Sequence, residues 1–86
     1  MHFVYILRSK VDDKFYVGMT QNLKERVAVH NAGRVRPTKA RRPFELIYAE
    51  SYATRQEARA REKFLKSYAG SKTKKSIVES LYGPIV

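Results

Sequence analysis

The sequence predicts a small α+β domain, an α/β sandwich in which a three-stranded antiparallel sheet is flanked by helices. Short runs of β-branched and aromatic residues alternate with longer segments of helical periodicity. The expected elements follow one another in the order β-β-α-β-α-α. A chain of 86 residues has room for only one thin core, so we expect residues 1–86 to form a single domain.

Cap and stop residues indicate where the helices begin and end. Thr20 or Asn22 can cap the first helix and Gly33 stops it, whereas Thr54 and Glu57 form a capping box before the second. We expect strands over 3–8, 15–19 and 44–52, and helices over about 20–31, 54–69 (stopped at Gly70) and 73–82 (before Gly83-Pro84). The residues expected to share a core-facing side are Phe44, Leu46 and Tyr48 of the third strand, and Ala58, Phe64, Leu65, Tyr68 and Ala69 of the second helix.

The first two strands are expected to form a hairpin with a polar turn. If its loop is two or four residues long and centred on Asp12-Asp13, Tyr5 and Tyr16 project from the same face, offset along the hairpin. An odd-length loop would put them on opposite faces. The two tip carboxylates are interpreted as a solvated turn rather than a metal site.

Charge gives the first indication of function. The chain carries 18 Lys and Arg against 8 Asp and Glu, a formal net charge of +10. A domain this basic usually binds a polyanion, most often nucleic acid, although a role in solubility alone is the alternative. Binding to an anionic membrane would also require bulky apolar residues along one helix face. The candidate nucleic-acid contacts are Arg34, Arg36, Lys39, Arg41 and Arg42 in an expected loop over 34–43, and Arg59, Lys66, Lys74 and Lys75 further on.

Several classes of protein are not expected. No apolar run approaches the roughly 20 residues of a membrane span, and the first residues lack the pattern of a signal peptide. The chain has no cysteine, so neither a disulfide framework nor a thiolate metal site is possible. We therefore expect a cytoplasmic protein without a membrane partner.

The first helix breaks its own apolar stripe. Leu23, Arg26, Val27 and His30 have the spacing of a core-facing side, yet two of the four are polar. Arg26 needs an anionic partner, either a protein carboxylate in a structural salt bridge or a ligand phosphate. His30 is either a hydrogen-bonded histidine at the helix end or a functional group.

Glu62 is the corresponding exception in the second helix. It falls at the rim of the apolar arc, beside the basic strip of Arg55, Arg59 and Lys66. A lone carboxylate there is either an ion-pair partner or a ligand for a hard divalent cation such as Mg²⁺. Such an ion can be held by one carboxylate, with waters and a substrate phosphate completing its shell.

Taken in order, these residues resemble the signature of the GIY-YIG nucleases. The pair Val4-Tyr5-Ile6-Leu7 and Tyr16-Val17-Gly18 is similar to the two motifs that name the family, with Val4 and Val17 in place of its Gly and Ile. The segments that carry Arg26 with His30, and then Glu62, are similar to the family's arginine-bearing and glutamate-bearing helices. The resemblance covers nearly the whole chain and is nearest to the small single-domain members.

The resemblance implies hydrolysis of phosphodiester bonds in nucleic acid with one divalent ion, Mg²⁺ or Mn²⁺, and we expect DNA ahead of RNA as the substrate. It implies that Tyr5 is the general base for the attacking water and that Tyr16 contacts the phosphate or the attacking group. It also implies that Arg26 stabilises charge on the phosphate, that His30 assists proton transfer, and that Glu62 holds the metal. Since a phenol has an ordinary pKa near about 10, we expect Arg26, His30 and the metal to act as cationic neighbours that make Tyr5 a better base.

One family residue has no counterpart. Many family nucleases carry an asparagine about a dozen residues beyond the glutamate, where this chain has Thr73-Lys74-Lys75. Either Lys74 or Lys75 serves the phosphate instead, or the chain is a catalytically weak or inactive nucleic-acid-binding module on the same fold. A protein-interaction domain with a basic surface is the third hypothesis. The sequence carries no signature of a preference for DNA or RNA, of the structure or sequence that is cut, or of the oligomeric state.

Overall fold

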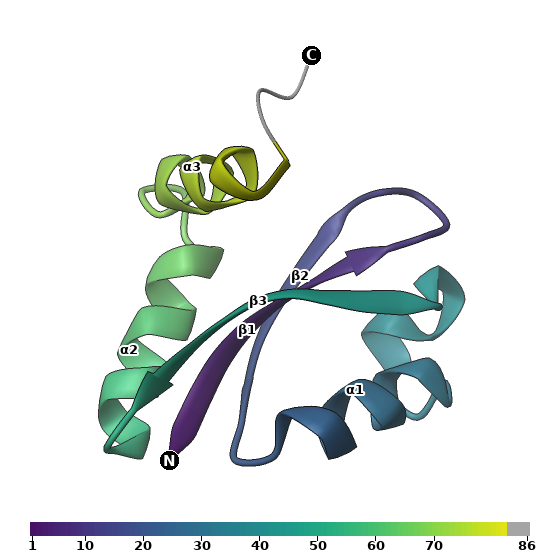
Figure 1. The fold of residues 1–86 in the computed structure, drawn as a ribbon, viewed down its shortest axis with the longest axis horizontal. Helices are drawn as coiled ribbons and strands as arrows, with labels where there is room; N and C mark the ends of the chain where they lie inside the picture. The colour runs from purple at the N-terminus through teal and green to yellow at the C-terminus, as the bar shows by residue number, and fades with distance from the viewer. Residues whose placement is uncertain (83–86) are drawn as a thin grey trace.

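The computed structural model describes residues 1–82 (Figure 1). The elements are β1 (His2–Ser9), β2 (Phe15–Thr20), α1 (Leu23–Asn31), the short 3-10 helix η1 (Arg36–Arg41), β3 (Phe44–Tyr52), α2 (Arg55–Lys66) and α3 (Ser71–Tyr82). Their order and the antiparallel sheet confirm the predicted α+β class. The predicted stop of the last helix at Gly83-Pro84 lies outside the described residues.

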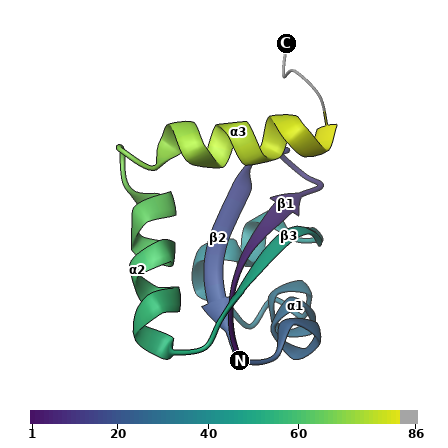
Figure 2. The same ribbon diagram turned by 60° about the vertical axis from the view of Figure 1, so that its left-hand side comes forward.

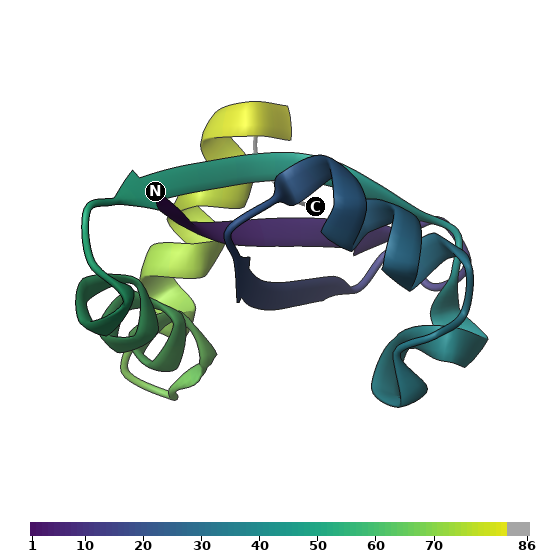
Figure 3. The same ribbon diagram turned by 90° about the horizontal axis from the view of Figure 1, so that it is seen from below.

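β1 is the centre of the sheet, whose strand order is β2-β1-β3. It pairs antiparallel with both neighbours, and its Val4–Leu7 stretch is buried on both faces. Figures 1 and 2 show α1 on one side of the strands and α2 on the other, with α3 running across the end of the sheet. In Figure 3 the strands lie side by side with α1 in front of them, and α3 passes behind β3.

Alternate residues of β1 build two separate cores. The core that joins β1 and β2 to α2 consists of Val4, Ile6, Val17, Ala58 and Leu65. The core toward α1 consists of Tyr5, Leu7 and Phe44, against which Tyr16, Leu23 and Val27 pack. The sheet is thus covered on both faces, and the tyrosines of the hairpin belong to the α1 side.

The hairpin register confirms the predicted placement of the two tyrosines. Tyr16 pairs with Leu7, two residues along β1 from Tyr5, so the two tyrosines share a face and are offset by two residues along the strands. The loop itself is longer than the expected two or four residues, because the last pair is Arg8 with Phe15, and its centre is Val11-Asp12 rather than the expected Asp12-Asp13. The loop is still even in length, which is why the prediction of the shared face is correct.

The turn of the hairpin is stabilised by hydrogen bonds within the turn and by hydrogen bonds to η1. The Ser9 hydroxyl accepts hydrogen bonds from the backbone N–H groups of Val11 and Asp12 and donates to the carbonyl of Arg41. Arg41 Nε in turn donates to Asp12 Oδ2 at 3.0 Å. The tip is therefore an ion-paired turn, and the expectation of a plain loop over 34–43 is wrong because this segment contains η1.

β3 changes face at a bulge. Its pairing with β1 moves from Leu46 directly to Tyr48, which leaves Ile47 as an extra residue. Phe44 consequently packs in the core toward α1, whereas Tyr48 packs in the core toward α2. The predicted alternation of Phe44, Leu46 and Tyr48 on one face is wrong, since one extra residue reverses every side chain beyond it.

α2 ends at Lys66, earlier than the sequence predicts. The backbone of Ser67 is extended, and its hydroxyl donates to the carbonyl of Phe64 at 2.6 Å. A serine hydroxyl that bonds the backbone in this way competes with continued helix. Tyr68 is consequently 97% exposed and Ala69 is exposed too, so neither belongs to the apolar side of α2.

Glu50 joins β3 to α2 through four hydrogen bonds that the sequence did not reveal. Tyr48 and Tyr52 each donate their hydroxyl to the carboxylate at 2.7 Å, and Arg61 donates Nε and Nη2 at 2.9 and 3.1 Å. Burial alone raises the pKa of Glu50, but the hydrogen bonds from Arg61, Tyr52 and Tyr48 outweigh it and hold the pKa below its ordinary value. The bidentate pair fixes α2 one residue before Glu62.

Replacing Glu50 by glutamine is expected to lower the free energy of unfolding by about 1–3 kcal/mol at neutral pH, because Arg61 loses its anionic partner. The folded-state pKa of Glu50 is depressed, so its contribution is present above about pH 4.3 and is lost as the pH falls through the folded value. Urea titrations at neutral pH and near about pH 3.5 measure both effects. Glu25→Gln, an exposed carboxylate on α1, should change stability by less than about 0.5 kcal/mol. Equal losses in the two variants would contradict the assignment.

Candidate active site

Tyr5 is the centre of the site. Its side chain is buried, and its hydroxyl lies 3.0 Å from His30 Nε2 and accepts a bond from Arg26 Nε at 3.4 Å. Gly18 lies opposite Tyr5 in β2, and a Cβ atom there would come within 2.5 Å of the phenol's Cζ atom. Only glycine lets the ring lie over the β2 backbone at this position.

α1 brings Arg26 and His30 to this hydroxyl. The helix is capped by Asn22, which accepts from the Glu25 N–H, and two residues after its end at Asn31 stands Gly33, whose φ of +76° suits glycine. Because Leu23 and Val27 pack on the sheet, Arg26 and His30 on the same stripe are directed at Tyr5. The structure thus brings together three residues that the sequence singled out separately.

Arg26 is free to meet a ligand. Within residues 1–82 no carboxylate forms an ion pair with it, and its one hydrogen bond goes to Tyr5. The hypothesis of a structural salt bridge is therefore not supported. A half-buried guanidinium with spare donors is suited to phosphate oxygens.

His30 is fully buried and neutral at ordinary pH. Burial, followed by the positive charge of Arg26, lowers the pKa of His30 to about 4. Its Nδ1 lies 2.9 Å from Oγ1 of Thr38, a residue that the sequence analysis did not single out. The expectation that His30 acts as a cationic neighbour of Tyr5 is wrong, because a ring with this pKa is uncharged at neutral pH.

The pKa of Tyr5 is also shifted against the sequence-based expectation. Burial raises it, and the hydrogen bond and charge of Arg26 lower it by less, so the pKa lies above its ordinary value. The negative charge of Glu62 adds to the rise. In the protein without metal, Tyr5 therefore keeps its proton at neutral pH and is not poised as a phenolate.

Tyr16 and Lys66 connect this group to α2. The ring centroids of Tyr16 and His30 are 5.0 Å apart, and Lys66 Nζ lies 5.6 Å from the Tyr16 ring centroid. Lys66 also donates to Glu62 Oε2 at 3.2 Å, one turn back along the helix. The contacts thus run from the tyrosines of the hairpin to the carboxylate that the sequence singled out on α2.

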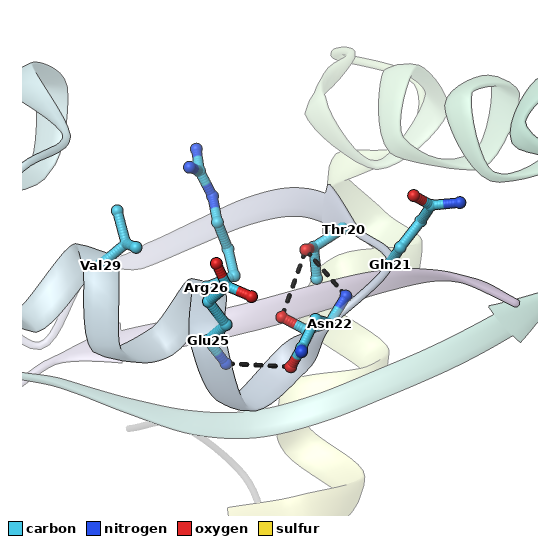
Figure 4. Close-up of a pocket in the computed structure, with 6 residues that line it drawn as sticks. All are labelled: Thr20, Gln21, Asn22, Glu25, Arg26 and Val29. Atoms are coloured by element: carbon cyan, nitrogen blue, oxygen red, sulfur yellow. Dashed lines mark hydrogen bonds between the residues drawn. The ribbon is translucent and has the colours of Figure 1, made fainter.

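Two hollows meet at the junction of β2 and α1. One, of about 350 Å³, is lined by Thr20, Gln21, Asn22, Glu25, Arg26 and Val29 (Figure 4). The other, of about 480 Å³, is lined by His2, Met19, Thr20, Gln21, Arg55, Arg59 and Glu62. Because both include Thr20 and Gln21, they are neighbours, with Arg26 at one and Glu62 at the other. Figure 4 shows the hydrogen bonds of Asn22 with Thr20 and Glu25 that shape this junction.

Glu62 fits a metal that is held by one protein carboxylate. Its side chain is 15% exposed and lines the larger hollow, which leaves room for waters and a phosphate. Its pair with Lys66 is an ordinary i,i+4 contact worth about 0.3–0.5 kcal/mol, so an ion could displace it. No group of three or more His, Asp and Glu that could form an all-protein cage occurs in the described part of the chain. Both hypotheses for Glu62, ion pair and metal ligand, are compatible with this geometry.

The candidate nucleic-acid contacts fall into two groups. The exposed ones are Arg34, Arg36, Lys39, Arg42, Arg59, Lys66 and Lys75, and Lys74 is half-buried. Arg41 is instead engaged with Asp12 and with the ring of Phe44. Arg55 shares the wall of the larger hollow with Arg59, one helical turn away, which its spacing in the sequence could have shown. No helix among residues 1–82 is long and apolar enough to cross a membrane.

Comparisons with known proteins agree with this geometry. A family model described as "GIY-YIG catalytic domain" matches residues 1–75. The UPF0213 protein SH2523 of Staphylococcus haemolyticus is 40% identical over 79 residues, covering 91% of this chain and 95% of that protein. The UPF0213 protein YazA of Bacillus subtilis is 42% identical over 79 residues, covering 91% and 79%.

A solved structure shows the same fold. The solution NMR structure of the UPF0213 protein BH0048 from Bacillus halodurans is 29% identical, with a TM-score of 0.57, and the match covers 95% of this chain and 89% of that one. The names of these relatives state no substrate and no reaction. The match of the family model over residues 1–75 extends across β1, β2, α1, β3 and α2 and so includes every residue of the site described above. The chain therefore belongs to the GIY-YIG nuclease superfamily.

Proposed function

We propose that this chain is a metal-dependent nuclease that hydrolyses phosphodiester bonds in DNA, in a single domain over residues 1–86. The observation that carries the proposal is the hydrogen-bonded group of Tyr5, Arg26 and His30, connected through Tyr16 and Lys66 to Glu62. Family membership supports nucleic acid as the class of substrate and a divalent ion as the cofactor. The net charge of +10 supports a polyanionic partner.

In the proposed reaction Tyr5 relays a proton and is never required to be a free phenolate. As the water attacks phosphorus, Tyr5 Oη takes the water's proton while its own proton passes to His30 Nε2, which lies 3.0 Å from Oη. A new P–O bond forms to the water oxygen, and the bond from phosphorus to the leaving sugar oxygen breaks, with solvent water supplying the proton that this oxygen takes up. His30 is suited to this step because it is neutral and buried beside the phenol.

The other residues bind and orient the phosphate. Arg26 donates to its non-bridging oxygens, where negative charge grows in the transition state. Tyr16 lies beside His30 and is placed to contact the phosphate or the attacking water. Glu62 would hold one Mg²⁺ or Mn²⁺, which when bound stabilises charge on the leaving oxygen.

The second candidate function is a nucleic-acid-binding module with little or no catalysis. It is favoured by the absence of the asparagine that many family nucleases carry. The structure offers no replacement at the hollows, since neither Lys74 nor Lys75 lines them. Such a module would bind nucleic acid in a salt-sensitive manner without forming product.

A cleavage assay distinguishes the two functions. The protein is incubated with single-stranded, duplex and branched DNA and with RNA, in the presence of Mg²⁺, Mn²⁺ or a chelator. The nuclease predicts product that requires a divalent ion, on DNA above RNA. Binding at low salt without product on every substrate would replace the nuclease by the binding module.

Arg59→Gln is expected to weaken DNA binding several-fold at low salt, similarly for all sequences, because it removes one phosphate contact on the wall of the larger hollow. The slope of log K against log salt should fall by about 0.9 in magnitude, which fluorescence anisotropy over a salt series measures. Arg41→Gln is the matched control, since Asp12 already neutralises that guanidinium. An equal change of slope in both variants would show that Arg59 contributes to DNA binding only through its charge and not through its place at the larger hollow.

A further inference from the structure

We propose that Thr38 is a positioning residue that holds His30 in the tautomer whose Nε2 accepts the proton of Tyr5. The proposal rests on the proposed function, because it assigns a residue to the proton path of that reaction. Thr38 touches neither hollow and lies behind His30, on the side away from Tyr5.

The Thr38 hydroxyl has two hydrogen-bond neighbours, His30 Nδ1 and the Val35 carbonyl, and one proton to donate. Its Oγ1 lies 3.3 Å from the carbonyl oxygen of Val35, which can only accept. A hydroxyl has one proton, so once Thr38 donates it to Val35 its oxygen must accept from His30 Nδ1 at 2.9 Å. In this arrangement Nδ1 carries the ring proton, and Nε2 of the neutral imidazole is the acceptor.

The environment of Tyr5 supports the same tautomer independently. Arg26 Nε donates to the Tyr5 oxygen, because a guanidinium cannot accept. If His30 Nε2 also carried a proton, the phenol oxygen would face two donors and its own proton would have no acceptor in this buried site. With Nε2 unprotonated, the Tyr5 hydroxyl donates to His30 at 3.0 Å and each group has a partner.

η1 is what places Thr38 at this position. The Thr38 N–H also donates to the Val35 carbonyl, at 3.1 Å, so backbone and side chain bind the same oxygen one tight turn back. Thr38 is fully buried although its neighbours Pro37 and Lys39 are exposed. These contacts hold Thr38 behind His30.

A neutral partner suits a transient proton acceptor. The groups that face His30 are Tyr5 of β1, Tyr16 of β2, Phe44 of β3, Arg26 of its own helix, and Thr38. No carboxylate among the described residues bonds the ring, and Arg26 opposes a positive charge on it. A carboxylate in place of Thr38 would stabilise the imidazolium and retain the proton. The neutral threonine hydroxyl orients the ring without stabilising a positive charge on it.

The test measures the tautomer directly, by ¹⁵N NMR of the histidine side chains in the full chain at neutral pH. Wild type is expected to show His30 with Nδ1 protonated and Nε2 bare. Thr38→Val keeps the shape and removes the hydroxyl, so the ring should populate the other tautomer, whereas Thr38→Ser should restore the wild-type pattern. In metal-dependent cleavage of DNA, kcat of Thr38→Val should fall roughly 10- to 100-fold with KM unchanged, and kcat of Thr38→Ser should stay close to wild type.

Two results would overturn the assignment. The first is a wild-type His30 that carries its proton on Nε2. The second is a folded Thr38→Val variant that keeps both the Nδ1-protonated ring and the wild-type kcat. If wild type cuts no substrate, yet its ring is protonated on Nδ1 and the tautomer changes in Thr38→Val, the role of Thr38 stands and only the nuclease proposal fails. If Thr38→Val does not fold, the spectra of wild type and Thr38→Ser decide.

Discussion

Replacing Glu62 by alanine is expected to lower the rate of phosphodiester cleavage by about 10³-fold or more at saturating Mg²⁺ or Mn²⁺. The reason is that Glu62 is the carboxylate on the wall of the larger hollow, where waters and phosphate would complete the shell of an ion. DNA binding should stay the same or become tighter, because the substitution removes a negative charge and frees Lys66 from its ion pair. Product formation and fluorescence anisotropy, measured on the same preparations, separate the two effects.

Glu79→Gln serves as the control for Glu62. Glu79 lies on α3 and also contributes a single negative charge, so a loss of activity that follows from net charge alone would appear in both variants. Glu62→Gln adds a second comparison, because it keeps the shape of the side chain but is a poor ligand for a hard cation. Cleavage at the wild-type rate by Glu62→Ala would show that the metal is held elsewhere or that none is used.

The sequence predicted those features that depend on local pattern. The apolar runs around Tyr5 and Tyr16 and the caps at Asn22 and Thr54 gave the strands and helices to within a few residues, apart from the end of α2. The position of Arg26 on the core-facing side of α1 predicted that its side chain points at the sheet, where it meets Tyr5. The even length of the hairpin loop predicted that Tyr5 and Tyr16 share a face. These predictions hold because helix and strand periodicity fix directions before any long-range contact forms.

Features that depend on contacts between distant segments could not be predicted. The bulge at Ile47 reverses the faces of the β3 side chains that follow it. The hydroxyl of Ser67 bonds the backbone where α2 ends, so the helix stops before Tyr68. No sequence pattern marks Thr38, because what distinguishes it is its contact with His30 in the folded structure. The predicted protonation behaviour of Tyr5 and His30 was wrong because it too depends on contacts between distant segments. Burial outweighs the charge of Arg26 at Tyr5 and acts together with that charge at His30, and burial is set by how the sheet and α1 pack.

Replacing Tyr5 by phenylalanine is expected to lower kcat by about 10²- to 10⁴-fold while KM and the fold are retained. The ring keeps its packing against Leu7 and Phe44, so only the hydroxyl that carries the proton from water to His30 is lost. Stability should fall by about 1 kcal/mol, since His30 Nε2 and Arg26 each lose a partner. Single-turnover cleavage measures the chemical step, and a urea titration measures the change in stability.

Tyr52→Phe is the matched control, because it also removes one tyrosine hydroxyl, from a half-buried side chain on the opposite side of the sheet, where the partner is Glu50. It should lose stability and keep its kcat. The pH profile of wild type adds an independent check on the partner of Tyr5. His30 accepts a proton only while it is neutral, so cleavage should decline as the pH falls through about 4 and not near the ordinary histidine value of about 6.5. A wild-type rate in Tyr5→Phe would mean that another group takes the proton of the attacking water, and the hydrogen bond from Tyr5 to His30 would then serve stability alone.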